Sequence, residues 1–167
     1  QQLEGEAREG AGIGRLCAGA EGAVEGGRWR LTHKQTVGRG AVRALADEIG
    51  DIEIVYPVHP NPNVVEPARE LLSDHERIHL IEPVGYLDLV AGLSSAALVL
   101  TDSGGIQEEA PAFGVPVLVL REVTERPEGI EAGVAELVGT DRDLILERSR
   151  AALARSAADT PATNPYG

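Results

Sequence analysis

Short apolar runs alternate with longer amphipathic stretches from Trp29 to near the end of the chain. This alternation predicts βαβ units, in which parallel strands are joined by helices that cover the sheet. The predicted strands are 29–32, 52–56, 78–81, 97–101 and 115–120, with a weaker strand at 136–138. The predicted helices are 40–49, 64–73, 86–94, 105–113 and 142–157.

The apolar runs are almost continuous, as is typical of strands that are buried on both faces. The fold class that this predicts is α/β, with a doubly wound parallel sheet in one domain over 29–167. The apolar stripe expected on the last helix, a surface helix, is Leu144, Ile145, Ala151 and Ala152. Residues 1–28 are rich in glycine and lack such periodicity, so this leader is assigned neither structure nor function.

Charge and composition exclude several classes of function. The chain has 167 residues, 15 of them Lys or Arg and 27 Asp or Glu, a formal net charge of −12. Binding to nucleic acid is not expected, because it needs clustered cations. A membrane-spanning helix is not expected, because no apolar run is long enough to cross a bilayer. Export is not expected either, because no basic segment precedes an apolar stretch at the start of the chain. A cytoplasmic protein is predicted, and the lone Cys17 fits a reducing compartment.

Two further features concern the origin of the sequence. It contains no methionine, so we expect it to be a fragment of a longer protein. Lys34 is the single lysine, which fits either a salt-adapted or a GC-rich source. The chain also lacks CxxC, HExxH, Walker A and GxSxG motifs, so zinc, P-loop and α/β-hydrolase sites have no support.

The most informative motif follows the predicted strand 97–101. Ser103, Gly104 and Gly105 lead directly into a predicted helix. The first N–H groups of a helix have no partner within it and lie at the positive end of its dipole, so an anion such as phosphate is stabilised there. Glycine lets a ligand approach the backbone, and the serine hydroxyl can donate to a phosphate oxygen.

The same motif also fits a plain helix cap. Ser103 or Asp102 would then be the N-cap, and Gln107 or Glu108 would close a capping box. Glu108 or Glu109 could accept hydrogen bonds from a ribose, or either could be a solvated helix carboxylate. Sequence alone leaves these alternatives open.

Two other loops after predicted strands carry candidate residues. His59 lies between prolines that hold its loop extended, so it could bind a ligand or titrate near neutrality, or simply satisfy backbone groups. Arg126 could clamp a diphosphate through its planar guanidinium and Glu125 could bind a sugar, or both could belong to a solvated charged loop. His33 follows the first strand. Ligands of doubly wound sheets bind beyond these carboxyl ends.

Several motifs together resemble the non-hydrolysing UDP-N-acetylglucosamine 2-epimerases. They are Thr-Asp-Ser-Gly-Gly-Ile-Gln-Glu-Glu-Ala-Pro at 101–111, Gly-Val-Pro-Val-Leu-Val-Leu-Arg at 114–121, Thr-Glu-Arg-Pro-Glu at 124–128, Pro-Val-His-Pro-Asn-Pro-Asn-Val at 57–64 and Asn-Pro-Tyr-Gly at 164–167. The resemblance extends over about 29–167. It implies a GT-B-like architecture of two Rossmann-like halves, of which this chain resembles the second, UDP-binding half.

The resemblance also implies a reaction. UDP would be eliminated anti from UDP-N-acetylglucosamine to leave 2-acetamidoglucal, and its return to the other face would give UDP-N-acetylmannosamine, a precursor of surface polysaccharides. The expected partners are UDP and UDP-N-acetylglucosamine, with no metal or other cofactor, and the full-length enzyme is expected to be a homodimer.

Site residues follow from the resemblance position by position. Those assigned to UDP are Ser103, Gly104, Gly105, Glu109 and Arg126. The serine and glycines would bind the diphosphate, Glu109 the ribose hydroxyls, and Arg126 would lie beside the diphosphate. His33 matches an active-site histidine, and His59 matches one that contacts a second, allosteric UDP-N-acetylglucosamine.

This sequence departs from the family pattern at several places. The segment after His33 is shorter and lacks a glutamate, Val84 and Gly85 replace a polar stretch that faces uracil, and Leu89 replaces a common aromatic. The acid and base carboxylates belong to the first domain, and the final helix is absent. The chain alone is therefore expected to bind UDP without catalysis. Alternatives are a non-catalytic UDP-binding remnant, a hydrolysing epimerase and a GT-B glycosyltransferase.

Overall fold

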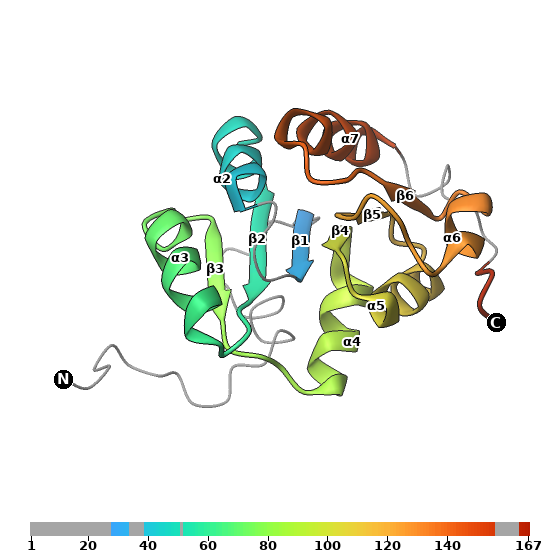
Figure 1. Cartoon of the computed structure of the whole chain (residues 1–167), viewed down its shortest axis with the longest axis horizontal. Coiled ribbons are helices and arrows are strands. Elements are labelled where there is room, and N and C mark those ends of the chain that lie inside the picture. Colours follow the sequence, from blue (N-terminus) through green and yellow to red (C-terminus); the bar gives the residue numbers. More distant parts are fainter. Residues whose placement is uncertain (1–27, 34–38, 51, 156–163) are drawn as a thin grey trace.

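The computed structural model describes residues 28–33, 39–50, 52–155 and 164–167 (Figure 1). Its sheet has six parallel strands in the order β3-β2-β1-β4-β5-β6. The strands are β1 (Arg28–His33), β2 (Ile52–Pro57), β3 (Ile78–Ile81), β4 (Ala96–Thr101), β5 (Val117–Val119) and β6 (Ala135–Leu137). The helices are α2 (Arg39–Glu48), α3 (Pro62–Leu72), α4 (Tyr86–Ser95), α5 (Gly104–Glu109), the 3₁₀ helix η1 (Ala110–Phe113), α6 (Pro127–Glu131) and α7 (Arg142–Ala154).

The strand order confirms the predicted doubly wound sheet and fixes where a ligand would bind. The chain runs outward from β1 to β3, then returns to β4 beside β1 and continues to β6. The order therefore reverses between β1 and β4, where His33 pairs with Thr101. Loops that leave neighbouring strands in opposite directions open a crevice at such a switch point, and ligands bind there.

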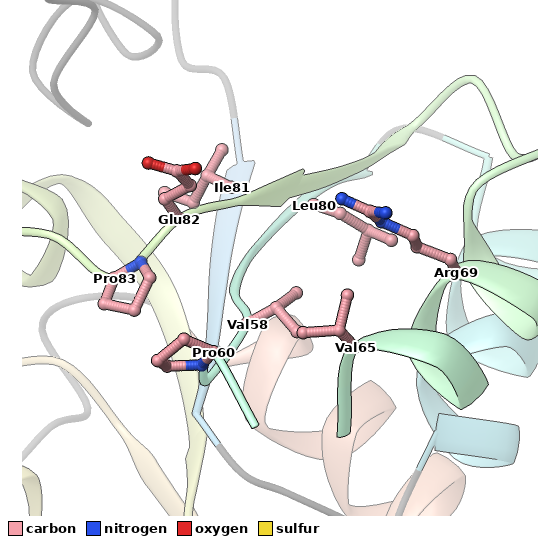
Figure 2. Close-up of a pocket in the computed structure, with 8 residues that line it drawn as sticks. All are labelled: Val58, Pro60, Val65, Arg69, Leu80, Ile81, Glu82 and Pro83. Carbon is pink, nitrogen blue, oxygen red and sulfur yellow. The ribbon is translucent and has the colours of Figure 1, made fainter. Parts of the chain in front are cut away.

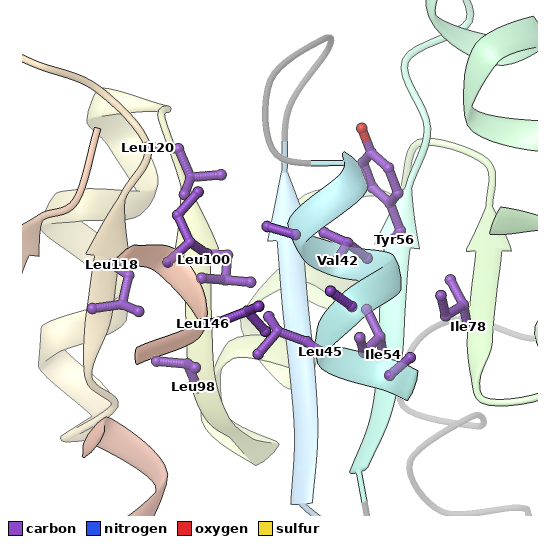
Figure 3. Packing of buried hydrophobic residues seen from close by; sticks show 14 of the residues in the cluster. Val42, Leu45, Ile54, Tyr56, Ile78, Leu98, Leu100, Leu118, Leu120 and Leu146 are labelled. Carbon is purple, nitrogen blue, oxygen red and sulfur yellow. The ribbon is translucent and has the colours of Figure 1, made fainter. Parts of the chain in front are cut away.

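Helices cover both faces of the sheet, and each face has its own apolar core. One core lies between the sheet and α2, α3 and α7, where Leu45 and Leu146 pack with Leu98 and Leu100 (Figure 3). The other lies under α4, α5 and η1 and includes Val99, which alternates with those leucines along β4. Burial of each leucine side chain stabilises the fold by about 1.5–3 kcal/mol.

The starts of α3 and α7 are fixed by local side-chain hydrogen bonds. Asn61 caps α3, where its Oδ1 accepts a hydrogen bond from the N–H of Asn63, and Pro62 follows at the first helical position. Asp141 caps α7 by accepting from the N–H of Leu144. The 3₁₀ helix η1 ends at Gly114, whose φ of +68° lies in the left-handed region that favours glycine.

The structure corrects three of the predicted elements. Residues 127–131 were expected to be loop but form α6, which begins with Pro127 and is too short to show periodicity. The predicted helix 105–113 is instead α5 followed by η1, because Pro111 has no N–H with which to continue the α-helical ladder. Of the predicted strand 115–120, only Val117–Val119 forms a strand.

The stripe predicted on the last helix is also partly wrong. Ala151 is exposed and Leu144 is only half-buried. The buried face is Ile145, Leu146, Ser149, Ala152 and Leu153. Its spacing is that of an ordinary helix face, turned so that α7 packs against α2 as well as the sheet. Positions 156 and 157 of the predicted helix, and residues 1–27 of the leader, lie outside the described residues.

Candidate functional site

The turn after β4 leaves the Ser103 side chain uncommitted to the helix. Ser103 is the N-cap of α5, yet its hydroxyl makes no capping bond. Its N–H donates to Oγ1 of Thr101 over 3.0 Å, which fixes the start of the turn instead. Gln107 and Glu108 bond elsewhere, so the capping-box alternative is wrong and the half-exposed Ser103 hydroxyl is available to a ligand.

Gly104 and Gly105 border open space. A Cβ added to Gly104 would meet no described atom within 4 Å, and one added to Gly105 would lie 3.9 Å from Ser103 Oγ. Neither residue has a positive φ. Packing and backbone conformation therefore do not require glycine at these positions. A bare backbone does, however, let an external group approach the N–H groups that open α5.

Arg126 is held at four points at the start of α6. Its N–H donates to Thr124 Oγ1 (3.0 Å) and its carbonyl oxygen accepts from the Tyr166 hydroxyl (3.3 Å). In the side chain, Nε is paired with Glu108, and Nη1 donates to the carbonyl of Glu125 (3.2 Å). Nη2 makes no bond to any residue that the structure describes. The guanidinium is oriented but keeps donors for a ligand.

The Glu108 pair connects this cation to the helix that the glycine turn opens. Glu108 lies four residues after Gly104 and near the other end of the six-residue α5, so the two positions share one face of the helix. The hydrogen bond that Arg126 donates to Glu108, and then the negative charge of Glu108, raise the pKa of Arg126 further above its ordinary value. Both side chains are 39% exposed, so the pair stays in reach of solvent and ligand.

A buried amide connects α5 to the Arg126 loop. The Thr124 hydroxyl donates to Gln107 Oε1 over 2.6 Å, and Gln107 is 1% exposed. Its Nε2 is buried without a hydrogen-bond partner among the described residues. Sequence reasoning considered Gln107 only as a helix cap, because its partner lies seventeen residues away and nothing local indicates it.

Glu109 differs from its neighbour in having no arginine partner and one buried, unpaired carboxylate oxygen among the described residues. The residue is half-buried, and its Oε2 makes no bond within the part of the chain that the structure describes. Glu108 is engaged by Arg126. Of the two carboxylates that the sequence offered to a ribose, Glu108 is therefore paired with a cation, whereas Glu109 has a buried oxygen without a partner among the described residues.

Three polar residues that had no predicted role in the site are buried near the switch point. Arg39 opens α2, Tyr56 lies in β2 and Asp102 follows β4, and each is at most 6% exposed. Burial raises the pKa of Tyr56, while the charge and hydrogen bond of Arg39 act in the opposite direction. Arg121 Nε lies 3.9 Å from Asp102 Oδ2. This cluster ties together the strand ends that carry the site.

The two candidate histidines are not joined to this group. His33 ends β1 opposite Thr101, but its side chain lies outside the described part of the structure. His59 is exposed, and its Nδ1 accepts from the N–H of Asn61 over 3.3 Å. A ligand-binding role for either histidine stays a prediction.

A separate pocket of about 410 Å³ lies beside His59, between α3 and the ends of β2 and β3. Figure 2 shows Val58 and Val65 pointing toward Leu80, with Arg69 and Glu82 on opposite sides of them. The pocket is lined by other residues than the Ser103 turn and the Arg126 loop. It does not contribute to the candidate site.

Two classes of site have no counterpart in the described residues. No group of three or more His, Cys, Asp or Glu side chains is arranged to hold a metal ion. None of the helices within these ranges combines the length and apolar character needed to cross a bilayer.

Comparisons with known proteins agree on one family. Residues 32–167 match the family model of UDP-N-acetylglucosamine 2-epimerase. The chain is 47% identical over 143 residues to the UDP-N-acetylglucosamine 2-epimerase of Escherichia coli (strain K12), covering 80% of this chain and 38% of that relative. It spans about a third of the length of the curated relatives it matches.

Solved structures give the same result. The S. aureus protein MnaA, in a co-structure with UDP, is similar with a TM-score of 0.77 and 41% identity, over 84% of this chain and 42% of that chain. The UDP-GlcNAc 2-epimerase of Neisseria meningitidis bound to UDP-GlcNAc is similar with a TM-score of 0.74 and 37% identity, over 84% and 41%.

Proposed function

Because this chain belongs to the UDP-N-acetylglucosamine 2-epimerase family, we propose that it is the UDP-binding half of an enzyme that interconverts UDP-N-acetylglucosamine and UDP-N-acetylmannosamine. The single observation that supports this most directly is the fixed guanidinium of Arg126, paired with Glu108 on the same short helix that the open glycine turn begins. A diphosphate needs both a cation with fork geometry and free backbone donors.

Each part of the site has a proposed contact with UDP. The N–H groups of Gly104 and Gly105 and the Ser103 hydroxyl donate to the diphosphate oxygens. Arg126 donates through Nη2 and the remaining Nη1 proton. The unbonded carboxylate oxygen of Glu109 accepts from a ribose hydroxyl. The solved relatives with UDP and UDP-GlcNAc support this class of ligand.

The contribution of this half to the reaction is electrostatic. When the bond between the sugar C1 and the diphosphate breaks, negative charge increases on the leaving diphosphate. Donors already aimed at that charge stabilise the transition state without rearranging first. Arg126 and the turn at Ser103 supply such donors. The proton transfers at C2 need an acid and a base, which this proposal assigns to the first half of the full-length protein.

Three further assignments complete the proposal. His33 is the active-site histidine, since β1 ends beside Thr101 at the switch point. His59 contacts a second, regulatory molecule of the substrate. The full-length protein is a cytoplasmic homodimer that inverts C2 without releasing free sugar. A full-length protein that converts UDP-N-acetylglucosamine into free N-acetylmannosamine and UDP would contradict this last assignment.

Calorimetric titration of UDP into this chain tests the proposal. We expect saturable binding that Arg126→Ala and Glu109→Ala each weaken by about 1–3 kcal/mol, or roughly 5–150-fold, as for lost hydrogen bonds to charged groups. Arg142→Ala is the matched control, because it removes an equal charge from an exposed position on α7. A chain that unfolds cooperatively yet binds no UDP at millimolar concentration would contradict the proposal and favour a non-binding remnant.

A further inference from the structure

The last described residues reach back to the Arg126 loop. Residues 164–167 form a turn in which Asn164 Oδ1 accepts from the N–H of Tyr166 over 3.2 Å. This turn directs the Tyr166 side chain to the start of α6. There its hydroxyl accepts from the N–H of Gly129 (2.9 Å) and donates to the carbonyl oxygen of Arg126 (3.3 Å).

Gly129 is shaped to receive this hydroxyl. A Cβ at Gly129 would lie 2.6 Å from the Tyr166 oxygen, which is closer than real Cβ contacts allow. Glycine is needed there because of the tyrosine, since Gly129 has no positive φ. The contact is a specific fit between two segments that lie 37 positions apart in the sequence.

Tyr166 acts at the point where the backbone changes direction. Arg126 is the N-cap of α6 with φ −126° and ψ 64°, outside the helical and extended regions. Thr124 holds the N–H of Arg126 and Tyr166 holds its carbonyl oxygen. Fixing both sides of one Cα fixes the direction in which its side chain leaves the backbone, and Glu108 then fixes the rotation of the guanidinium.

We propose that Tyr166 is a positioning residue for the diphosphate-binding Arg126, which rests on the function proposed above. The tyrosine touches no ligand. It lowers the cost of ordering Arg126 on binding, because the main chain is already fixed before UDP arrives. Its effect should therefore be confined to the part of the ligand that Arg126 contacts.

Comparing UDP with uridine in a Tyr166→Phe chain tests this role. Phenylalanine keeps the ring and removes only the hydroxyl. We expect the affinity for UDP to fall about 2–12-fold, as for one net hydrogen bond. The affinity for uridine, which lacks the diphosphate, should not change. Ser95→Ala is the control, since it removes a hydroxyl that donates to the Ala91 carbonyl on α4. Equal losses for UDP and uridine, or no loss for UDP, would overturn the proposal.

A double-substitution cycle separates positioning from general stabilisation. In an Arg126→Ala chain, Tyr166→Phe should cause no further loss of UDP affinity, because the group it positions is gone. Additive losses would overturn the proposal. Gly129→Ala provides a second route, since its methyl group would displace the hydroxyl of Tyr166. Gly129→Ala should also weaken the binding of UDP and not that of uridine. Added to Tyr166→Phe, it should reduce UDP affinity by less than it does in the wild-type chain.

A measurement without ligand keeps this inference distinct from the proposed function. If the wild-type chain binds no UDP, the proposed function fails, and hydrogen exchange of the Arg126 amide then decides the role of Tyr166. That amide donates to Thr124 Oγ1 in the same loop. Faster exchange and an altered Arg126 Nε–H resonance in Tyr166→Phe would support positioning. Unchanged exchange and resonance would overturn it.

Discussion

Two arginines lie at opposite ends of the parallel strands and have different uses. We call the side of the sheet where the strands begin the amino edge, and the side where they end the carboxyl edge. Arg77 lies at the amino edge, where Nη1 donates to the carbonyl of Ile49 (2.7 Å) and Nη2 is bonded to that of Ala46. Ala46 lies in the last turn of α2 and Ile49 directly follows the helix, and carbonyls at such a helix end lack partners within the helix. Arg126 lies at the carboxyl edge and is held largely by its main chain and Nε. Its Nη2 and one proton of Nη1 remain for a ligand.

The surroundings of the two arginines differ in the same way. At the amino ends of the strands, the exposed pair of Arg43 with Asp74 and the half-buried pair of His79 with Glu53 join neighbouring elements. At the carboxyl edge, the polar groups form a connected set from Gln107 through Thr124 to Arg126. The lesson is that the amino edge uses polar contacts to hold helices in place, while the carboxyl edge uses them to orient one cation.

The largest expected effect is on stability at the amino edge. Arg77→Ala should lower the free energy of unfolding by about 1.5–3 kcal/mol, because two helix-end carbonyls lose a charged donor. UDP affinity should stay within about twofold of wild type. Urea unfolding and calorimetry measure both quantities, with the exposed Arg69→Ala on α3 as the control. A large loss of UDP affinity in Arg77→Ala would break the distinction between the edges.

The next effect should appear in stability and binding together. Thr124→Val leaves the buried Gln107 amide without its partner, at a cost of about 1–3 kcal/mol in unfolding free energy. It also removes the acceptor of the Arg126 N–H, so UDP affinity should fall. Adding Gln107→Leu should restore much of the stability but not the affinity, because both buried polar groups are then replaced. Restored affinity in that double variant would contradict the account of the carboxyl edge.

A smaller effect should depend on pH. Burial, and the negative charges of Glu128 and Glu108, raise the pKa of the Tyr166 hydroxyl, so the folded chain favours the neutral phenol. Wild type should exceed Tyr166→Phe in unfolding free energy by about 0.5–1.5 kcal/mol at pH 8. This advantage is complete below the ordinary tyrosine pKa of about 10 and should vanish as pH rises through the raised value. Urea unfolding from pH 8 to 11 measures it, and a constant difference would contradict it.

The smallest effect should come from the exposed pair at the amino edge. The hydrogen bond from Arg43 lowers the pKa of Asp74, so any stabilisation exists above the ordinary aspartate pKa and is lost as pH falls through the lowered value. Asp74 is 70% exposed. Asp74→Asn should therefore shift the urea midpoint less than any change above, and less again in high salt. A shift as large as that of Arg77→Ala would show that this pair holds the helices.

Hydrophobic periodicity was sufficient to predict most of the fold. Strands β2 to β4 lie within a residue of the predicted positions, because strands buried on both faces are continuously apolar. Short elements such as α6 gave no periodic signal. The positions of Ser103 and Arg126 at neighbouring strand ends followed from the sheet topology. The roles assigned to them through the resemblance stay predictions.

The residues that contact Arg126 could not be predicted from residue type and spacing. Glu108 was compatible with a capping role and with a ribose-binding role, and the Asn-Pro-Tyr-Gly motif that contains Tyr166 does not indicate which residue the tyrosine contacts. Each contact joins segments eighteen or forty residues apart, and only the folded chain brings them together. Residue type and spacing can indicate that a cation is available, but not which main-chain and side-chain atoms orient it.

The strand order has a consequence for association between copies. The outermost strands of the described sheet are β3, with four residues, and β6, with three. An exposed strand edge offers unpaired backbone groups to another chain, and short edge strands limit this route to aggregation. The sheet therefore offers little room for extension by a second copy, and assembly of this protein should rely on side-chain surfaces instead of added strands.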